Sequence, residues 1–298
     1  MSWIQLKLDT TPEQSNAVED LLLDCGALAV TFLDGCDQPL YEPDLGTTPL
    51  WNNLRILGLF AADTDGEAVI AHLNDVIPGS YQAHRIEIVE DKDWEREWMT
   101  HFHPMQFGTR LWVCPSWKEV PDANAVNLML DPGLAFGTGT HPTTALCLKW
   151  LDAQDLASKQ VIDYGCGSGI LAIAALLLGA EHALGVDTDP QALEASRNNA
   201  ERNTIEEGRL HVCYPRNTPD TVADIMVANI LAGPLVSLAE TLASHTRQGG
   251  LLALSGILSE QAEDVLTAYA PWFDMEPVTE QDGWVRLSGV RRENNLRT

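Results

Sequence analysis

Residues 161–170 read Val-Ile-Asp-Tyr-Gly-Cys-Gly-Ser-Gly-Ile, an apolar strand that passes through a glycine-rich turn into an apolar helix. Glycines in such a turn permit positive φ angles and let a ligand approach the backbone closely. A nicotinamide site requires the spacing G-x-G-x-x-G, whose third glycine would fall at position 170 here. This chain has Ile170 at that position, so the turn does not fit a nicotinamide cofactor.

The residues that shape the turn follow a different spacing. They are Asp163, Gly165, Gly167 and Gly169, which form the pattern D-x-G-x-G-x-G. This pattern is typical of the first motif of S-adenosylmethionine enzymes, and it makes these four residues candidates for cofactor binding. A plain tight turn between a strand and a helix is the alternative interpretation.

A second motif favours the cofactor interpretation. Residues 185–190 read Gly-Val-Asp-Thr-Asp-Pro. Asp187 ends the next predicted strand, where a carboxylate can accept hydrogen bonds from both hydroxyls of a ribose. Asp189 followed by Pro190 has the pattern of a helix N-cap, so we expect a structural role for Asp189 and cofactor binding by Asp187.

Asn229 ends the fourth predicted strand of this region, at the edge where ligands of open α/β sheets bind. Its amide oxygen can accept a hydrogen bond from an incoming amine, which makes Asn229 the candidate catalytic residue. Related amine-directed methyltransferases have Pro-Pro after this Asn, whereas this chain has Ile230 and Leu231. That difference argues against adenine or cytosine as the target. An Asn that only caps the following turn is the alternative.

The segment of residues 131–144 combines glycine and proline hinges with several hydroxyl side chains, just before a predicted helix. We predict a mobile lid over the cofactor here. An ordinary loop with Pro142 at the start of the helix is the alternative. Two roles stay open for His141, a catalytic base and a hydrogen-bonding loop residue.

From about residue 126 the sequence alternates between strands and helices, which predicts a parallel sheet. The predicted strands span residues 161–163, 183–187, 210–213, 225–228, 251–255, 273–278 and 284–289, and the predicted helices span residues 170–178, 190–203, 235–245 and 259–270. A closing antiparallel pair is typical of a Rossmann-like methyltransferase domain, which we assign to residues 126–298.

Residues 1–90 predict a small ferredoxin-like α+β domain, because their elements follow the order β-α-β-β-α-β. The predicted strands span residues 4–8, 28–33, 54–60 and 81–90, and the helices span residues 12–25 and 67–76. Residues 91–125 are predicted to be a linker with a helix that carries Trp94 and Trp98 one turn apart. We expect these tryptophans to pack between the domains, with stacking on a substrate as the alternative. The predicted fold class is therefore α/β, with a small α+β domain in front.

The chain of 298 residues has 18 Lys and Arg against 43 Asp and Glu, a net charge of −25. Direct nucleic-acid binding and docking on anionic lipid are not expected, because both need a basic face. The first 90 residues hold three basic side chains, Lys7, Arg55 and Arg85, against 15 acidic ones. A basic partner is the electrostatic complement of this region, and an acidic surface that serves only solubility is the alternative.

The six cysteines show neither the spacing of a zinc site nor a cluster with histidine, so no metal is expected. A disulfide framework is not expected in a chain of this length. Residues 1–8 lack the apolar core of a signal peptide, and the longest apolar run, residues 170–180, is too short to span a membrane. We therefore expect a cytoplasmic protein with free thiols.

Four runs of this sequence, at residues 131–144, 163–169, 185–190 and 228–235, resemble the PrmA family. These are bacterial methyltransferases that act on large-subunit ribosomal protein eleven. The resemblance covers nearly the whole chain, and the segment of residues 131–144 is its most specific part.

The resemblance implies that Thr144, Gly165, Asp187 and Asn229 contact S-adenosylmethionine. It also implies that the N-terminal domain recognises the basic ribosomal protein. Lysine side chains and an N-terminal amine would be the methylated groups, up to the trimethyl state. We expect the enzyme to be a monomer.

A lysine with a pKa of about 10.4 is mostly protonated at neutral pH and lacks the lone pair that methyl transfer needs. The sequence shows no Glu-His pair placed as a dedicated base, so we expect positioning of the amine to dominate catalysis. Two alternatives remain at this point. One is a methyltransferase for another amine substrate, and the other is a non-catalytic ribosome-assembly factor that only binds.

Overall fold

The computed structural model describes residues 2–36, 38, 49–90, 102–131 and 141–293. The chain divides into two compact units, Met1–Thr100 and His101–Thr298, each with its own core. The helix predicted around Trp94 and Trp98, and residues 132–140 of the predicted lid, lie outside the described residues.

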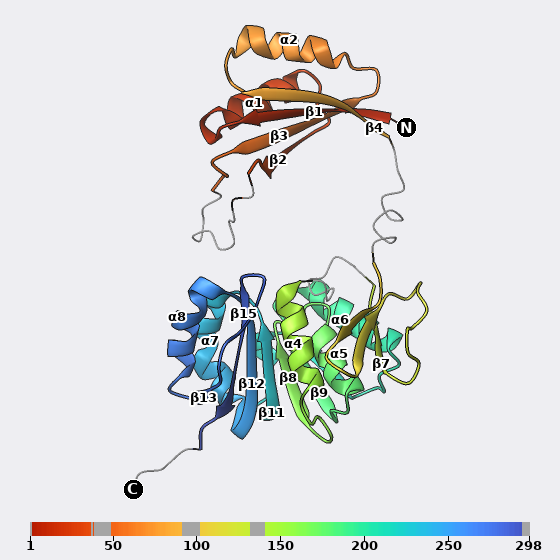
Figure 1. The fold of residues 1–298 in the computed structure, drawn as a ribbon, viewed down its shortest axis with the longest axis vertical. Helices are drawn as coiled ribbons and strands as arrows, with labels where there is room; N and C mark the ends of the chain where they lie inside the picture. The colour runs from red at the N-terminus through yellow and green to blue at the C-terminus, as the bar shows by residue number, and fades with distance from the viewer. Residues whose placement is uncertain (1, 37, 39–48, 91–101, 132–140, 294–298) are drawn as a thin grey trace. The chain divides into compact units, whose positions relative to one another are not determined.

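The first unit is a four-stranded antiparallel sheet with two helices on one face (Figure 1). Its elements are β1 (Ser2–Thr10), α1 (Pro12–Asp24), β2 (Ala29–Asp34), β3 (Leu54–Ala61), α2 (Gly66–Val76) and β4 (Ala83–Glu90). The strand order β2-β3-β1-β4 is the arrangement expected for a β-α-β-β-α-β chain, and the predicted ferredoxin-like domain is confirmed.

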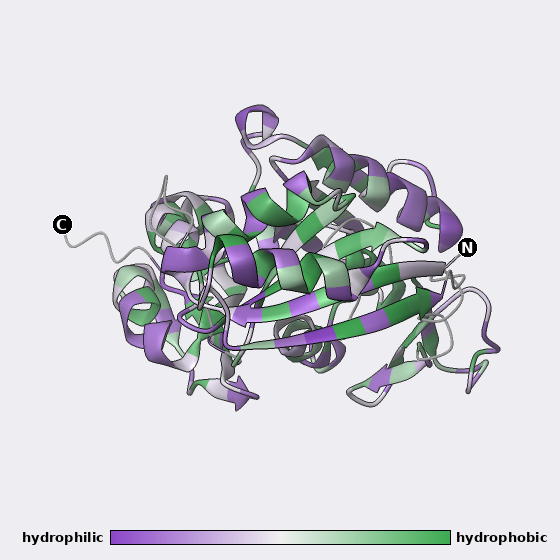
Figure 2. Ribbon diagram, turned by 90° about the horizontal axis from the view of Figure 1, so that it is seen from above, coloured by the Kyte–Doolittle hydropathy of each residue, from purple (hydrophilic) through white to green (hydrophobic). Residues whose placement is uncertain are grey.

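Alternation of apolar and polar residues decides which face of this sheet is covered. Leu6 and Leu8 of β1 are fully buried, while Gln5 and Lys7 between them are only half-buried. The same alternation of hydropathy is visible along the strands in Figure 2. Pro12 begins α1, and Asp65 caps α2 by accepting a hydrogen bond from the Ala68 amide (3.1 Å).

The second unit begins with a three-stranded sheet of β5 (Met105–Phe107), β6 (Leu111–Cys114) and β7 (Val126–Met129). Within the predicted linker of residues 91–125, β5 and β6 group with the second unit. The reason is the pairing of β6 with β7, which joins residues on both sides of the predicted boundary at residue 125. β5 has too few residues to show an alternating pattern in the sequence.

The large sheet follows the order β10-β9-β8-β11-β12-β15-β13, with β14 paired to β15. Its strands are β8 (Gln160–Tyr164), β9 (His182–Val186), β10 (Leu210–Cys213), β11 (Ala223–Asn229), β12 (Thr246–Leu258), β13 (Phe273–Met275), β14 (Thr279–Gln281) and β15 (Trp284–Arg291). Neighbours from β10 to β12 pair parallel, whereas β15 is antiparallel to β12 and β13. The predicted Rossmann-like methyltransferase fold is confirmed.

Helices cover both faces of this sheet, as Figure 1 shows. One face carries α4 (Pro142–Asp152), α5 (Ile170–Leu177) and α6 (Pro190–Arg202), and the other carries α7 (Ala232–Ser244) and α8 (Ala262–Tyr269). The chain leaves β8 toward β9 on one side, and β11 lies on the other side. The carboxyl ends of β8, β9 and β11 therefore meet at a switch point, where open α/β sheets bind ligands.

Candidate active site

The glycine-rich turn after β8 is held against the end of β9 by backbone hydrogen bonds. The amides of Gly165 and Cys166 both donate to the carbonyl oxygen of Val186, at 2.7 and 3.1 Å. Gly165, Gly167 and Gly169 have φ angles of +82°, +52° and +79°, a region that disfavours residues with a Cβ. All three predicted glycines are therefore favoured by the backbone conformation itself.

Close packing adds a second reason for these glycines. A Cβ atom at Gly165 would lie 2.1 Å from Cγ2 of Ile230, the residue that follows β11. A Cβ atom at Gly169 would lie 2.8 Å from the Ser196 hydroxyl of α6. The turn is thus packed between β11 and α6, a reason that motif spacing alone does not reveal.

Replacing Gly165 with Ala is expected to lower the free energy of unfolding by about 3 kcal/mol, from the positive φ angle and the clash together. Gly208 provides the matched control, because its φ is +86° and nothing lies within 4 Å of its Cβ position. Gly208→Ala should cost only about 1 kcal/mol. Chemical denaturation of both variants measures the difference, and equal losses would remove the packing argument.

Asp163 lies in β8, two residues before Gly165 of this turn, and is fully buried, with 0% of its surface exposed. Its Oδ2 accepts a hydrogen bond from the Ala172 amide in the first turn of α5 (3.0 Å). Its Oδ1 is buried and has no hydrogen-bond partner among the described residues. Burial raises the pKa of Asp163 to about 7, and the nearby Asp187 charge adds to the rise.

Asp187 follows β9 and connects two segments of the site. Its Oδ2 accepts a hydrogen bond from the Gly167 amide (2.9 Å), and its Oδ1 accepts one from the Asp189 amide (3.0 Å). Each carboxylate oxygen retains a further acceptor position, and the residue is half-buried rather than enclosed. Asp189 caps α6 by accepting from the Gln191 amide (2.8 Å), as its sequence pattern predicts.

Asn229 and Thr144 are brought together although 84 residues separate them along the chain. The Asn229 Nδ2 donates to the Thr144 hydroxyl (3.3 Å), and Thr144 is fully buried in the first turn of α4. This contact directs the nitrogen of the amide toward α4. The Oδ1 atom of Asn229 is buried and accepts no hydrogen bond from the described residues. It is therefore available to accept one from a bound ligand.

His141 is the N-cap residue of α4 and has a structural role in the described residues. Its Nδ1 lies 2.8 Å from the Thr143 hydroxyl, and its ring meets the Trp284 ring edge-on at 4.8 Å between centroids. Burial lowers the pKa of His141, which favours the neutral ring. Trp284 begins β15, and no motif in the sequence indicates that it reaches α4.

The arrangement fits a nucleoside cofactor with a cationic part. The fit rests on the orphaned Oδ1 atoms of Asp163 and Asn229, which are hydrogen-bond acceptors on neighbouring strands. Between them lies a turn whose backbone a ligand can approach because its residues are glycines. The carboxylate of Asp187 stands at the end of β9, on the other side of β8 from Asn229.

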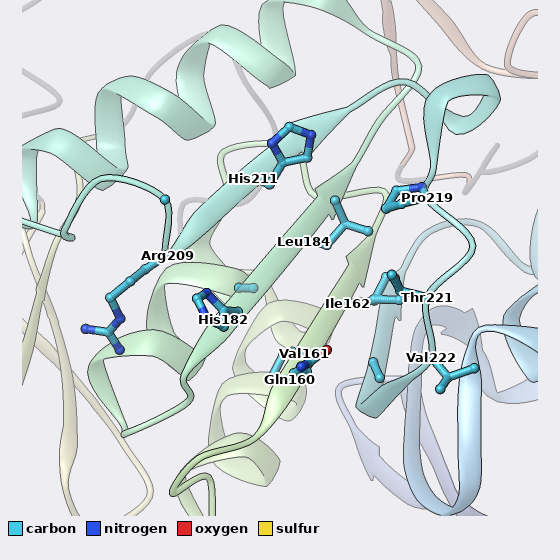
Figure 3. A pocket seen from close by; sticks show the side chains of 13 residues that line it. Gln160, Val161, Ile162, His182, Leu184, Arg209, His211, Pro219, Thr221 and Val222 are labelled. Atoms are coloured by element: carbon cyan, nitrogen blue, oxygen red, sulfur yellow. The ribbon is translucent and has the colours of Figure 1, made fainter.

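A separate pocket of about 250 Å³ lies at the amino ends of the parallel strands, opposite the carboxyl ends that form the site (Figure 3). Its wall includes Gln160, His182 and Ala223, which are the first residues of β8, β9 and β11. Parallel strands place these residues away from the carboxyl ends where the site lies. Between β10 and β11 the described chain has only the short helix η1 (Pro215–Asn217), so this part of the sheet face lacks a covering α-helix.

Within the described residues, no group of His, Cys, Asp and Glu side chains is arranged to hold a metal ion. No helix there is long and apolar enough to cross a membrane. All six cysteines are free thiols. Burial raises the pKa of Cys147 and of Cys166 to about 12, so neither thiol is a nucleophile.

Comparison with known proteins identifies the family. The family model described as "Ribosomal protein L11 methyltransferase (PrmA)" matches residues 2–292. The chain belongs to the PrmA family. It is 62% identical over 292 residues to the ribosomal protein L11 methyltransferase of Pseudomonas aeruginosa (strain LESB58), covering 98% of this chain and 99% of that protein. The Azotobacter vinelandii relative is 60% identical and is covered completely.

A solved structure supports the same family. The ribosomal protein L11 methylase from Lactobacillus delbrueckii subsp. bulgaricus is 32% identical, with a TM-score of 0.59 over 64% of this chain and 100% of that chain. The PrmA resemblance, the methyltransferase activity and the S-adenosylmethionine cofactor predicted from the sequence are confirmed. The individual cofactor contacts of Thr144, the motif residues and Asn229 stay predictions.

Proposed function

We propose that this PrmA-family enzyme transfers methyl groups from S-adenosylmethionine to lysine side chains and the N-terminal amine of ribosomal protein L11. The observation that carries the proposal is the orphaned Asn229 Oδ1 at the carboxyl edge of the sheet. A buried amide oxygen without a donor is complementary to an N–H of an amine. The name of the family matched over residues 2–292 supports the choice of protein substrate.

Cofactor binding is assigned to seven residues, each with its own part. Asp187 holds the ribose hydroxyls with its remaining acceptor positions. The backbone at Gly165, Gly167 and Gly169 leaves space for the cofactor over the turn, and Asp163 supplies negative charge beneath it. Thr144 holds the Asn229 amide in place (3.3 Å), and Asn229 would contact the reactive end of the bound cofactor.

Methyl transfer breaks a bond from sulfonium sulfur to carbon and forms a bond from nitrogen to the same carbon. The cofactor supplies the activated methyl group, and the protein must supply a correctly placed, neutral amine. Desolvation lowers the pKa of a lysine and so favours the neutral form. Asn229 accepts from the amine N–H and orients its lone pair, and water takes the proton. Orientation alone can supply roughly 7–11 kcal/mol of the barrier.

The first unit supports recognition of a basic protein by its charge distribution. The three basic residues of the stretch 1–90 lie on β1, β3 and β4 and form ion pairs: Lys7 with Glu87 (2.8 Å), Arg55 with Asp9 (2.6 Å) and Arg85 with Glu87 (3.6 Å). The helices on the other face carry exposed acidic side chains instead: Glu13, Asp20 and Asp24 on α1, and Glu67 and Asp75 on α2. The helical face therefore carries exposed negative charge without basic side chains of α1 or α2 to balance it, and we assign this face to the basic substrate.

The proposed reaction is tested by mass spectrometry of purified L11 after incubation with the enzyme and S-adenosylmethionine. Mass increments of about 14 Da on lysine residues and on the N-terminus are expected. A small-molecule amine incubated in parallel should stay unmodified. Binding of L11 without any mass increment would instead support a non-catalytic assembly factor. The monomeric state and the cytoplasmic location stay predictions.

Replacing Asp187 with Ala is expected to weaken cofactor binding about tenfold or more, because it removes charge-assisted hydrogen bonds. Calorimetry with S-adenosylmethionine measures the dissociation constant directly. Asp189→Ala is the matched control, since it removes a carboxylate two residues away that only caps α6. The control should lose about 1 kcal/mol of stability and keep its affinity. Equal affinities for both variants would refute the assignment of Asp187.

A further inference from the structure

The position of Asp163 is not explained by its hydrogen bond to the first turn of α5. In the parallel register it pairs with Gly185 of β9 and with Val227 of β11, two residues before Asp187 and two before Asn229. One oxygen satisfies the Ala172 amide, but Oδ1 is buried without a partner. An Asn at position 163 could accept from the same amide without burying a charge.

The groups around Asp163 do not compensate its negative charge. Asp187 at the end of β9 acts on it with the same sign. The thiols of Cys147 on α4 and Cys166 in the turn also face it, and both stay protonated. Arg286 of β15 acts on Cys147, but no positive charge among the described residues acts on Asp163. A fully buried carboxylate without a cation nearby is unfavourable when charged.

We propose that Asp163 is the counter-charge for a cationic group of S-adenosylmethionine and that it releases its proton to solvent when the cofactor binds. The inference rests on the proposed function, because it requires the cofactor to occupy this site. The proton leaves the carboxyl group, and no other bond is formed or broken. The cofactor carries two cations, a sulfonium and an ammonium, and either can stabilise the carboxylate.

The direction of the pH dependence follows from linkage. Burial raises the pKa of Asp163 to about 7 in the free enzyme, and an adjacent cation lowers it in the complex. Binding then favours the deprotonated carboxylate, so affinity rises with pH through the free-state pKa and levels off above it. Between pH 6 and pH 8 the gain is about tenfold.

Titration calorimetry at pH 7, in two buffers of different ionisation enthalpy, measures the protons exchanged on binding. The intact enzyme should release about half a proton per cofactor. Asp163→Asn keeps an acceptor for the Ala172 amide but cannot titrate, so its affinity should lose this pH dependence. The cofactor's own α-amino group titrates near pH 8. A neighbouring carboxylate favours its protonated form, so this amine would take up protons on binding, whereas Asp163 releases one. That uptake should persist in the variant.

His141 is the other nearby group that can titrate in this range. His141→Asn retains an N-cap for α4 and should still release the proton. S-adenosylhomocysteine, which lacks the sulfonium charge, and methylthioadenosine, which lacks both charges, separate the two cations. Release with S-adenosylhomocysteine identifies the ammonium as the partner, whereas release with S-adenosylmethionine alone identifies the sulfonium.

Two results would overturn the inference, and they differ in whether the proposed function survives. Normal cofactor binding with no proton release, or release that survives in Asp163→Asn, removes Asp163 from this role and leaves the proposed function intact. Absence of any cofactor binding to the intact enzyme removes both.

Discussion

Residues 101–298 alone are expected to bind S-adenosylmethionine with unchanged affinity and to methylate ribosomal protein L11 at least about 10²-fold more slowly than the intact chain. The second unit has its own core and contains every candidate site residue, so cofactor binding should survive. Removal of the acidic first unit would eliminate the second attachment point that we propose for the substrate. Loss of such a linked site typically reduces apparent affinity by about 10²–10⁴.

A short lysine peptide provides the control for this truncation. Such a peptide reaches the site without docking on the first unit, so intact and truncated enzymes should methylate it at the same slow rate. Rates on both substrates with the cofactor saturating separate loss of docking from loss of chemistry. Full activity of residues 101–298 on intact L11 would show that the first unit has no recognition role.

Much of the fold follows from local patterns in the sequence. The alternation in residues 4–8 and the apolar runs before Gly165 and Asp187 predict their strands, because each pattern is decided by residues close in the chain. Asn229 is correctly placed at the edge of the sheet for the same reason. In contrast, β5 and β14 have three residues each, too few for a period to be recognised.

The contacts within the site depend on tertiary structure and could not be predicted. The hydrogen bond from Asn229 to Thr144 joins β11 to α4, and the close approach of Ile230 to Gly165 joins two separate loops. The orphaned Oδ1 of Asp163 is a property of burial, which motif spacing does not report. Sequence patterns therefore identify the candidate residues, whereas the structure assigns their partners.

Replacing Asn229 with Ala is expected to lower kcat about 10²-fold at saturating cofactor, because a small misplacement of the reacting atoms is costly. Thr144 already occupies the amide nitrogen (3.3 Å), so the free Oδ1 is the atom available to the amine. A contact made chiefly in the reactive geometry lowers kcat, whereas a contact that only holds the cofactor raises its dissociation constant. The two roles are therefore separable by measurement.

Single-turnover rates with the cofactor saturating decide between these roles for Asn229. Asn217→Ala is the matched control, since it makes the same substitution at an exposed position in η1. A wild-type rate in a folded Asn229→Ala protein with weakened cofactor binding would limit Asn229 to holding the cofactor. A normal rate with only a lower melting temperature would make it a cap of the following turn. The expected result is a slow single turnover with only a modest fall in melting temperature, because the substitution removes the Nδ2 hydrogen bond to Thr144 (3.3 Å), whereas Oδ1 has no partner among the described residues.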